Sequence, residues 1–114
     1  MPRNMSFALT TDQVKDKSKT VTRRFGWKFL KPGDVLWAVE KAMGLKHGEK
    51  IKRLAKIKVV AVREEPLHAM PISDCAKEGF PEMVPQDFVA MLCNHYGSKI
   101  TGASMVNRIE FEYL

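Results

Sequence analysis

Alternating apolar and polar positions predict that this chain is built mainly from strands. Over Met105–Tyr113 the alternation is strict, so that Asn107, Ile109 and Phe111 share one face of a half-buried strand. The apolar run Val35–Val39 follows a Pro-Gly turn and predicts a central strand. Further strands are expected at Ser6–Leu9, Thr20–Arg24 and Ile51–Arg63.

Two of these strands carry expectations about their surroundings. Thr20, Thr22 and Arg24 alternate with their neighbours and should share one solvent-exposed side. The strand over Ile51–Arg63 should be exposed at its start and buried on both faces near its end, from 59 to 62.

Three short helices complete the predicted secondary structure. The clearest begins at Pro85 and ends before Gly97. Its stripe at i, i+3, i+4 and i+7 consists of Phe88, Met91, Leu92 and His95. The other two helices are marked by residues typical of helix ends: Thr10 or Thr11 before a helix to about Lys17, and Ser73 and Gly79 around a helix over 74–78.

The order of these elements predicts an α+β fold. The strands are not separated by regular helices, as a parallel sheet of βαβ units would require. We therefore expect a small antiparallel barrel or strongly curved sheet of about five or six strands, with two or three short helices appended. With 114 residues, 45% of them hydrophobic and 28% charged, the chain is expected to be one globular domain over 1–114.

The apolar runs and the cysteines of the sequence bear on where the protein is located and on whether it binds a metal. The apolar runs are too short to span a bilayer and the N-terminus lacks a signal pattern, so a cytoplasmic protein without membrane partners is expected. Cys75 and Cys93 belong to no Cys-x-x-Cys pair and are predicted to be free thiols. A zinc site formed by them with His68 and His95 is an alternative that their spacing disfavours, and no metal or cofactor is expected.

Charge is distributed unevenly along the chain. The formal net charge is +6, yet residues 15–63 hold fifteen basic and four acidic side chains, whereas residues 64–114 hold three basic and eight acidic ones. A concentrated basic segment is typical of proteins that bind phosphates, because neutralising phosphates releases counterions. A merely solvated surface is the alternative interpretation.

Residues 19–31 concentrate the candidate chemistry. Aromatic residues at alternating positions can stack on bases, and guanidinium groups can bind phosphate or a base edge. The aromatic side chains have an equally ordinary alternative, which is to pack in the core. The candidate ligand-binding residues of this segment are Arg23, Arg24, Phe25, Trp27 and Lys28.

Three residues of the segment 19–31 match the signature of a known family. Lys19, Thr22 and Arg24 match the Lys, Thr and Arg of the signature Gly-x-Lys-x-x-Thr-x-Arg, while Lys17 stands at the glycine position. The chain thus resembles the ASCH domain, of the PUA-like superfamily, and especially its short stand-alone members from bacteria and phages. The resemblance implies a barrel whose cleft is lined by the signature and binds RNA or a modified nucleoside.

Some small ASCH proteins remove the acetyl group from N4-acetylcytidine with a Lys, a Thr and a Glu. The resemblance assigns these catalytic roles to Lys19, Thr22 and Glu78. A lysine whose pKa is lowered by burial or neighbouring cations can take the proton of a threonine hydroxyl, and a carboxyl group can orient it or protonate the leaving amine. Glu40, at the end of a predicted buried strand, is an alternative acid and is expected to pair with Arg24.

The sequence therefore leaves three hypotheses of function. The first is a domain that binds RNA or a nucleoside at the signature cleft. The second is a metal-independent amidohydrolase acting on N4-acetylcytidine-type nucleosides. The third is an adaptor that presents its acidic C-terminal half to a protein partner.

Overall fold

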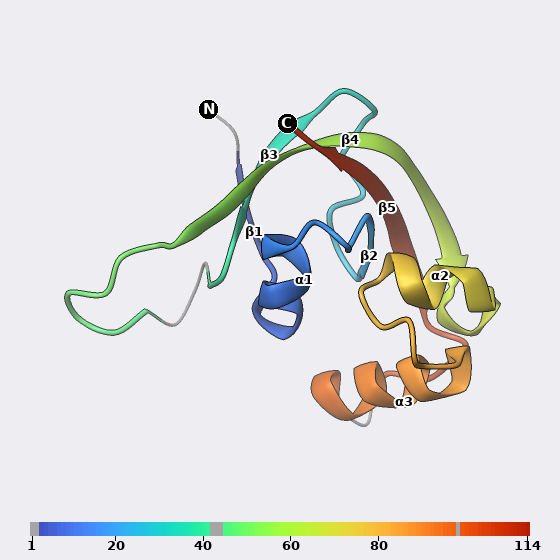
Figure 1. Cartoon of the computed structure of the whole chain (residues 1–114). Coiled ribbons are helices and arrows are strands. Elements are labelled where there is room, and N and C mark those ends of the chain that lie inside the picture. The colour runs from blue at the N-terminus through green and yellow to red at the C-terminus, as the bar shows by residue number, and fades with distance from the viewer. Residues whose placement is uncertain (1–2, 42–44, 98) are drawn as a thin grey trace.

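The computed structural model describes residues 3–41, 45–97 and 99–114. Within these residues five strands, three α-helices and two 3-10 turns follow one another (Figure 1). Their order is β1 (Arg3–Ser6), η1 (Ala8–Thr10), α1 (Thr11–Lys15), β2 (Val21–Arg24), β3 (Val35–Val39), β4 (Arg53–Pro66), η2 (Leu67–Ala69), α2 (Ile72–Lys77), α3 (Pro85–Tyr96) and β5 (Met105–Tyr113).

The strands form one curled sheet in the order β1-β3-β4-β5-β2. Three of the four pairings are antiparallel, but β1 runs parallel to β3, with Met5 opposite Ala38. The sheet is an open half-barrel rather than a closed one, and Figure 1 shows α1 lying beneath its arch. The predicted α+β class and strongly curved sheet are confirmed, and the expectation of a wholly antiparallel sheet is wrong for this one pair.

A bulge in β4 explains why its burial departs from the predicted pattern. Val59 pairs with Phe111 and Val62 pairs with Ile109, and the register shifts between them. Val60 is the inserted residue and is exposed, so that Val59 and Val62 both face inward although they are three positions apart. The predicted burial of both faces over 59–62 is therefore wrong.

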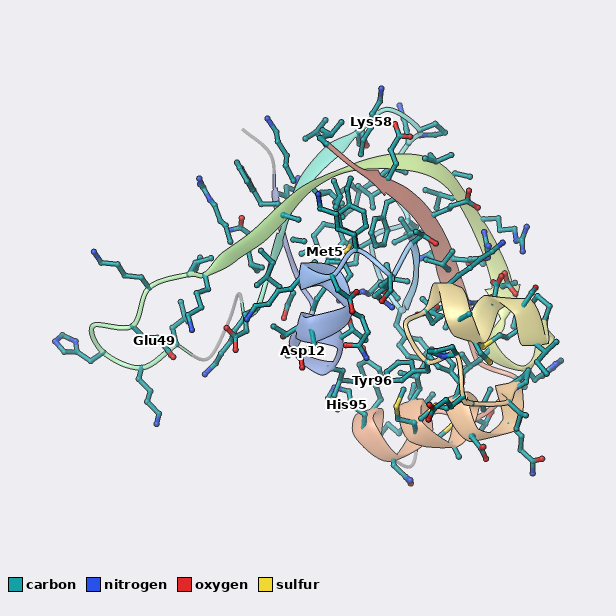
Figure 2. All side chains as sticks on the ribbon, in the orientation of Figure 1. Met5, Asp12, Glu49, Lys58, His95 and Tyr96 are labelled. Atoms are coloured by element: carbon teal, nitrogen blue, oxygen red, sulfur yellow. The ribbon has the colours of Figure 1, made fainter. Side chains whose placement is uncertain are left out.

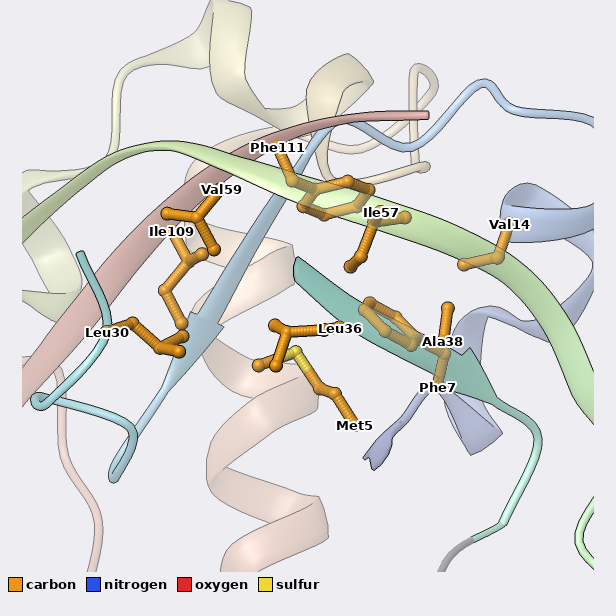
Figure 3. Close-up of a cluster of buried hydrophobic side chains, with 10 residues drawn as sticks. All are labelled: Met5, Phe7, Val14, Leu30, Leu36, Ala38, Ile57, Val59, Ile109 and Phe111. Carbon is orange, nitrogen blue, oxygen red and sulfur yellow. The ribbon is translucent and has the colours of Figure 1, made fainter. Parts of the chain in front are cut away.

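Two apolar clusters hold the sheet and helices together. The first lies inside the arch, where Phe7 and Phe111 meet edge-to-face with ring centroids 5.9 Å apart (Figure 3). The second packs α2 and α3 against the opposite face of β5, where Phe88 and Leu92 contact the cluster that contains Val106. Residue Val106 is buried on that face and Ile109 on the other, so the start of β5 is buried on both sides rather than half-buried.

Several local predictions need correction. The strand expected at Ser6–Leu9 lies at Arg3–Ser6, and the chain turns into η1 after Phe7. The helix expected over 74–78, with Ser73 as its cap, spans Ile72–Lys77, so that Ser73 lies inside the helix and Pro71 precedes it without a capping hydrogen bond. Gly79 and Gly97 do end α2 and α3 with positive φ angles of 100° and 96°, as predicted.

Strand β2 has the predicted alternation but not the predicted exposure. Thr22 and Arg23 are both buried, because η1 and α3 cover one face and α2 covers the other. The expectation of a solvent-exposed side on this strand is therefore wrong. No helix among the described residues is long and apolar enough to cross a membrane.

Candidate functional site

A cavity of about 260 Å³ opens on the concave side of β2. Its walls come from β2, η1, the end of α2 and one side of α3, which are far apart in the sequence. Figure 2 shows His95 and Tyr96 on the end of α3 nearest α1, and both line this cavity. Its volume matches a small planar ligand better than a folded peptide.

Lys19 is held at this cavity by its backbone and its side chain. Its N–H donates to the carbonyl of Gln13 at 3.2 Å, and its own carbonyl accepts from the Tyr113 hydroxyl at 2.5 Å. The side chain is 3% exposed, and its Nζ donates to Glu78 Oε1 at 2.7 Å and to the Glu78 carbonyl oxygen at 2.8 Å. Burial lowers the pKa of Lys19; Glu78 opposes that effect, and Arg24 and Arg23 add to it.

Glu78 is positioned by the end of α2. It is 2% exposed, and its second oxygen, Oε2, accepts from Arg23 Nη1 at 2.9 Å. Gly79 follows it with a positive φ, and a Cβ there would lie 2.8 Å from Gln13 Cγ. Gln13 Nε2 also donates to the Gly79 carbonyl at 3.2 Å. The absence of a side chain at Gly79 thus lets α1 pack against the turn that carries Glu78.

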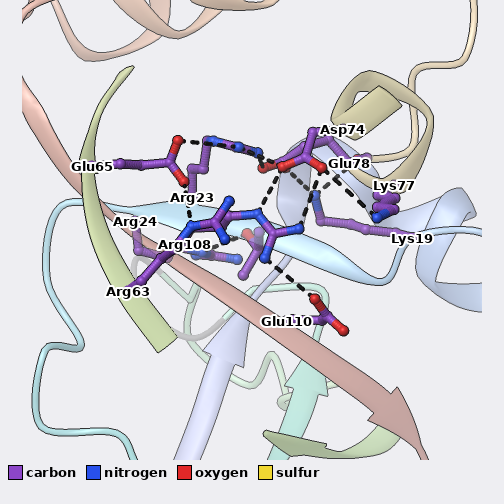
Figure 4. A network of polar contacts seen from close by, with 11 residues as sticks. Lys19, Arg23, Arg24, Arg63, Glu65, Asp74, Lys77, Glu78, Arg108 and Glu110 are labelled. Atoms are coloured by element: carbon purple, nitrogen blue, oxygen red, sulfur yellow. Dashed lines mark hydrogen bonds and ion pairs between the residues drawn. The ribbon is translucent and has the colours of Figure 1, made fainter. Parts of the chain in front are cut away.

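Behind Lys19 and Glu78 lies a buried network of opposite charges (Figure 4). Arg23 Nη2 donates to Asp74 Oδ2 at 2.6 Å, and Arg108 Nε donates to the same oxygen at 2.7 Å. Burial alone would raise the pKa of Asp74, but the hydrogen bonds from Arg108 and Arg23 outweigh it and lower the pKa to about 2. The network connects α2 to both β2 and β5.

Thr22 and Arg24 reach the cavity from the other face of β2. Arg24 Nε donates to Thr22 Oγ1 at 3.0 Å, and Arg24 Nη2 donates to the Ser6 carbonyl at 2.6 Å. The guanidinium group also lies 4.7 Å above the ring of Phe7. A cationic donor on Oγ1 stabilises negative charge on that oxygen, which is the charge that a nucleophilic threonine develops.

The structure brings together most, but not all, of the candidates from the sequence. Lys19, Thr22, Arg23, Arg24 and Glu78 line the cavity. Phe25 and Trp27 line a second cavity beside it.

Lys28 and Glu40 line neither of these two cavities. The expected pair between Glu40 and Arg24 is not formed, because Glu40 lies 3.6 Å from Lys52 Nζ while Arg24 bonds to Thr22 and Ser6. The predicted acid at the cavity is therefore Glu78 and not its alternative.

The zinc alternative finds no support in the geometry. Among the described residues, no three His, Cys, Asp or Glu side chains are grouped so that they could hold a metal ion. Cys75 is buried and Cys93 half-buried, and both are free thiols.

Four residues that shape the site were not predicted to belong to it. Asp74 and Arg108 form the second half of the charge network, and their sequence positions gave no sign of it because the partners are 34 residues apart. His95 and Tyr96 are exposed at the end of α3 and line the cavity. The sequence signal for His95 is the helical stripe, which places it in line with Phe88 and Leu92 at the C-terminal end of α3.

Comparison with known proteins identifies the fold. No protein-family model matches the sequence, and no curated protein is significantly similar to it. The structure is similar to protein EF3133 of the DUF984 family from Enterococcus faecalis V583, with a TM-score of 0.70 and 16% identity over 100% of this chain and 80% of that one. It is equally similar to the hypothetical protein PH0355, with a TM-score of 0.70 and 19% identity over the whole of both chains.

A third similar structure carries the name of the family that the signature suggested. It is an ASCH domain from Lactobacillus crispatus JV V101, with a TM-score of 0.62 and 13% identity over 97% of this chain and 78% of that one. The predicted PUA-like fold is thereby confirmed, since the match covers nearly the whole of this chain. This chain has the fold of an ASCH domain.

Proposed function

We propose that this ASCH-fold protein binds a nucleoside or nucleotide, free or within RNA, in the cavity on the concave side of β2. One observation carries the proposal: Lys19, which precedes β2, lines the same cavity as Thr22 and Arg24, so that all three matches to the ASCH signature converge on one site. The cavity offers hydroxyl, ammonium, guanidinium and carboxylate groups around apolar walls that include Phe88 and Met91. Such a mixture suits a flat, polar base.

The distribution of charge supports a nucleic-acid ligand over a protein partner. Of the acidic side chains in the second half of the chain, Glu65, Asp74 and Glu78 are buried in ion pairs with Arg23, Lys19 or Arg108. These three carboxylates neutralise cations inside the protein and therefore do not contribute to an acidic surface. The remaining exposed charge is predominantly basic.

Binding is tested by calorimetric titration of cytidine and of a short single-stranded RNA at several salt concentrations. The expected result is binding of both ligands, with an RNA affinity that falls as salt rises. Arg24→Gln should weaken the binding of both ligands at least about tenfold, because it removes a charged donor from the cavity. Lys58→Gln, at an exposed position on β4, is the matched control. The proposal fails if neither ligand binds or if the two variants behave alike.

A second candidate function, amide hydrolysis, is favoured by the contact between Lys19 and Glu78. A buried ammonium 2.7 Å from a carboxylate, in a cavity that also holds a threonine hydroxyl, provides a base, a proton carrier and a nucleophile. Burial lowers the pKa of Lys19, which increases the fraction of neutral amine that can accept a proton.

The reaction on an N4-acylated cytosine would proceed in two halves. Lys19 takes the proton of Thr22 Oγ1 as that oxygen attacks the acyl carbonyl, and Arg24 stabilises the charge that develops. The C–N bond breaks, the exocyclic amine receives the proton from Lys19, and the acyl group stays on Thr22 as an ester. Water, deprotonated by the amine of Lys19, then attacks the ester carbonyl. The bond between the acyl carbon and Thr22 Oγ1 breaks, Oγ1 regains its proton from Lys19, and acetate leaves. Glu78 keeps the amine in place throughout.

Hydrolysis is tested by incubating the protein with N4-acetylcytidine and measuring free cytidine. Lys19→Met and Thr22→Val should each lower kcat/KM by at least about a hundredfold, whereas Lys58→Gln should not. Mass spectrometry of the protein during turnover should detect an acetyl group on Thr22 if the ester accumulates. Turnover by Thr22→Val at the wild-type rate would refute this candidate while leaving the binding proposal intact.

A further inference from the structure

A second cavity of about 440 Å³ lies beside the first. Its walls come from β1 and from the segment that connects β2 to β3, and it shares Arg24 and Tyr96 with the first cavity. The two shared side chains make the cavities neighbours, so that one extended ligand can reach both.

The second cavity presents aromatic rings to solvent. Phe29 is 51% exposed, although large apolar side chains usually have most of their surface buried. Its ring lies 5.6 Å from that of Trp27 at an interplanar angle of 36°, and the guanidinium group of Arg3 lies 4.7 Å from its centre. Exposed rings beside guanidinium groups are the composition of surfaces on which single-stranded bases stack.

The backbone under this aromatic surface is held in an unusual conformation. Trp27 has a φ of 69°, which L-residues other than glycine rarely adopt. The preceding carbonyl, of Gly26, accepts a hydrogen bond from Asn107 Nδ2 at 2.7 Å, so that β5 fixes the turn from which Trp27 projects. Strained conformations of this kind persist where the surroundings impose them, and they are frequent at ligand-binding sites.

The charges around the second cavity have one sign. Arg3 and Arg24 are among its lining residues, and none of the described residues that line it is acidic. Arg24 lies at the boundary between the cavities, where its guanidinium group can donate to a phosphate that passes from one to the other.

We propose that the second cavity binds the nucleotide next in sequence to the one held in the first, with its base stacked on Phe29 and the linking phosphate beside Arg24. The preferred ligand is then a nucleotide within a single strand rather than a free nucleoside. This inference rests on the proposed function, because it requires a nucleoside in the first cavity. A nucleotide within a single strand has a neighbouring base that can contact Phe29 and Trp27, whereas a free nucleoside has none.

The test compares dinucleotides with mononucleotides, so that the second base is the main difference. The affinity of CpU is measured against that of cytidine 3′-monophosphate, and the affinity of UpC against that of cytidine 5′-monophosphate. None of these ligands carries an acyl group, so hydrolysis cannot consume them. At least one dinucleotide is expected to bind about tenfold or more tightly than its mononucleotide, which is the gain typical of one stacked base.

Phe29→Ala should reduce this ratio to below about twofold, and Phe29→Tyr should retain it. Ile72→Ala, at an exposed position on α2 away from both cavities, is the control and should keep the wild-type ratio. A ratio near one in the wild-type protein, or a ratio unchanged by Phe29→Ala, would overturn the inference while mononucleotide binding upholds the proposed function. If no mononucleotide or dinucleotide binds, both fail.

Discussion

Replacing Glu78 by glutamine removes one charge from the buried network with little change of shape. Both carboxylate oxygens are engaged, Oε1 by Lys19 at 2.7 Å and Oε2 by Arg23 at 2.9 Å, and all three side chains are buried. A glutamine offers one acceptor and one donor, so its amide nitrogen would face a cationic donor. The ammonium of Lys19 would then be buried without a neutralising partner.

The cost follows from burial. Removing one partner of a buried ion pair costs about 3–5 kcal/mol, whereas an exposed pair contributes about 0.2–1 kcal/mol. The protein contains a natural comparison in the exposed pair between Glu40 and Lys52, at 3.6 Å. Since small domains have a free energy of unfolding of about 5–15 kcal/mol, we expect Glu78→Gln to lose a large share of that stability and Glu40→Gln to lose less than about 1 kcal/mol.

Urea unfolding at neutral pH, followed by circular dichroism, measures both variants. Adding Lys19→Met to Glu78→Gln should recover at least about 1 kcal/mol of the loss, because the uncompensated ammonium is no longer present. Losses that are equal for Glu78→Gln and Glu40→Gln, or that simply add in the double variant, would refute the description of Lys19 and Glu78 as a coupled buried pair.

Three further predictions concern pH and backbone conformation. Because the pKa of Asp74 is about 2 in the folded protein and 3.8 in a model peptide, stability should fall as pH drops from 4 to 2, and Asp74→Asn should flatten that part of a urea-midpoint profile. Lys17 has a φ of 66°, so Lys17→Gly, which restores the signature glycine, should raise the melting temperature and stabilise the fold by about 0.5–1 kcal/mol; a lower melting temperature would contradict this. Gly79→Ala should destabilise by at least about 1–3 kcal/mol in chemical unfolding, since its methyl group would lie within 3 Å of Gln13, and an unchanged midpoint would show that α1 can move aside.

The parts of the fold that the sequence predicted correctly are those with a local signal. Strands β3 and β5 and helix α3 were predicted with the right bounds because β3 is one unbroken apolar run and the periodicity of the other two is unbroken. The bulge at Val60 was missed, since an inserted residue is visible only when the partner strand is known. The parallel pairing of β1 with β3 likewise depends on contacts between distant segments.

The candidate site could be predicted from the residues that match the signature, but not from the alternation of polar and apolar positions along β2. Thr20, Thr22 and Arg24 suggested an exposed side for β2, because a strand with many polar residues usually faces water. Here Lys19 and Arg23 instead meet the carboxylates of Asp74 and Glu78, in and directly after α2, more than 50 residues further along the chain. Only the signature of Lys19, Thr22 and Arg24 pointed to the cavity, and it did not reveal Asp74 or Arg108.

The buried network of ion pairs behind Lys19 and Glu78 also bears on function, in addition to its effect on stability. Well-packed apolar residues in place of buried ion pairs are often equally stable or more so, so that stability alone does not account for charges at these positions. The outer pairs, from Asp74 to Arg23 and Arg108, fix α2 against β2 and β5 and thereby fix the carboxylate of Glu78. Glu78 in turn holds the amine of Lys19 at the wall of the cavity, where burial lowers its pKa. A buried lysine with a lowered pKa, kept in place by such a framework, is what proton transfer to and from a bound ligand requires.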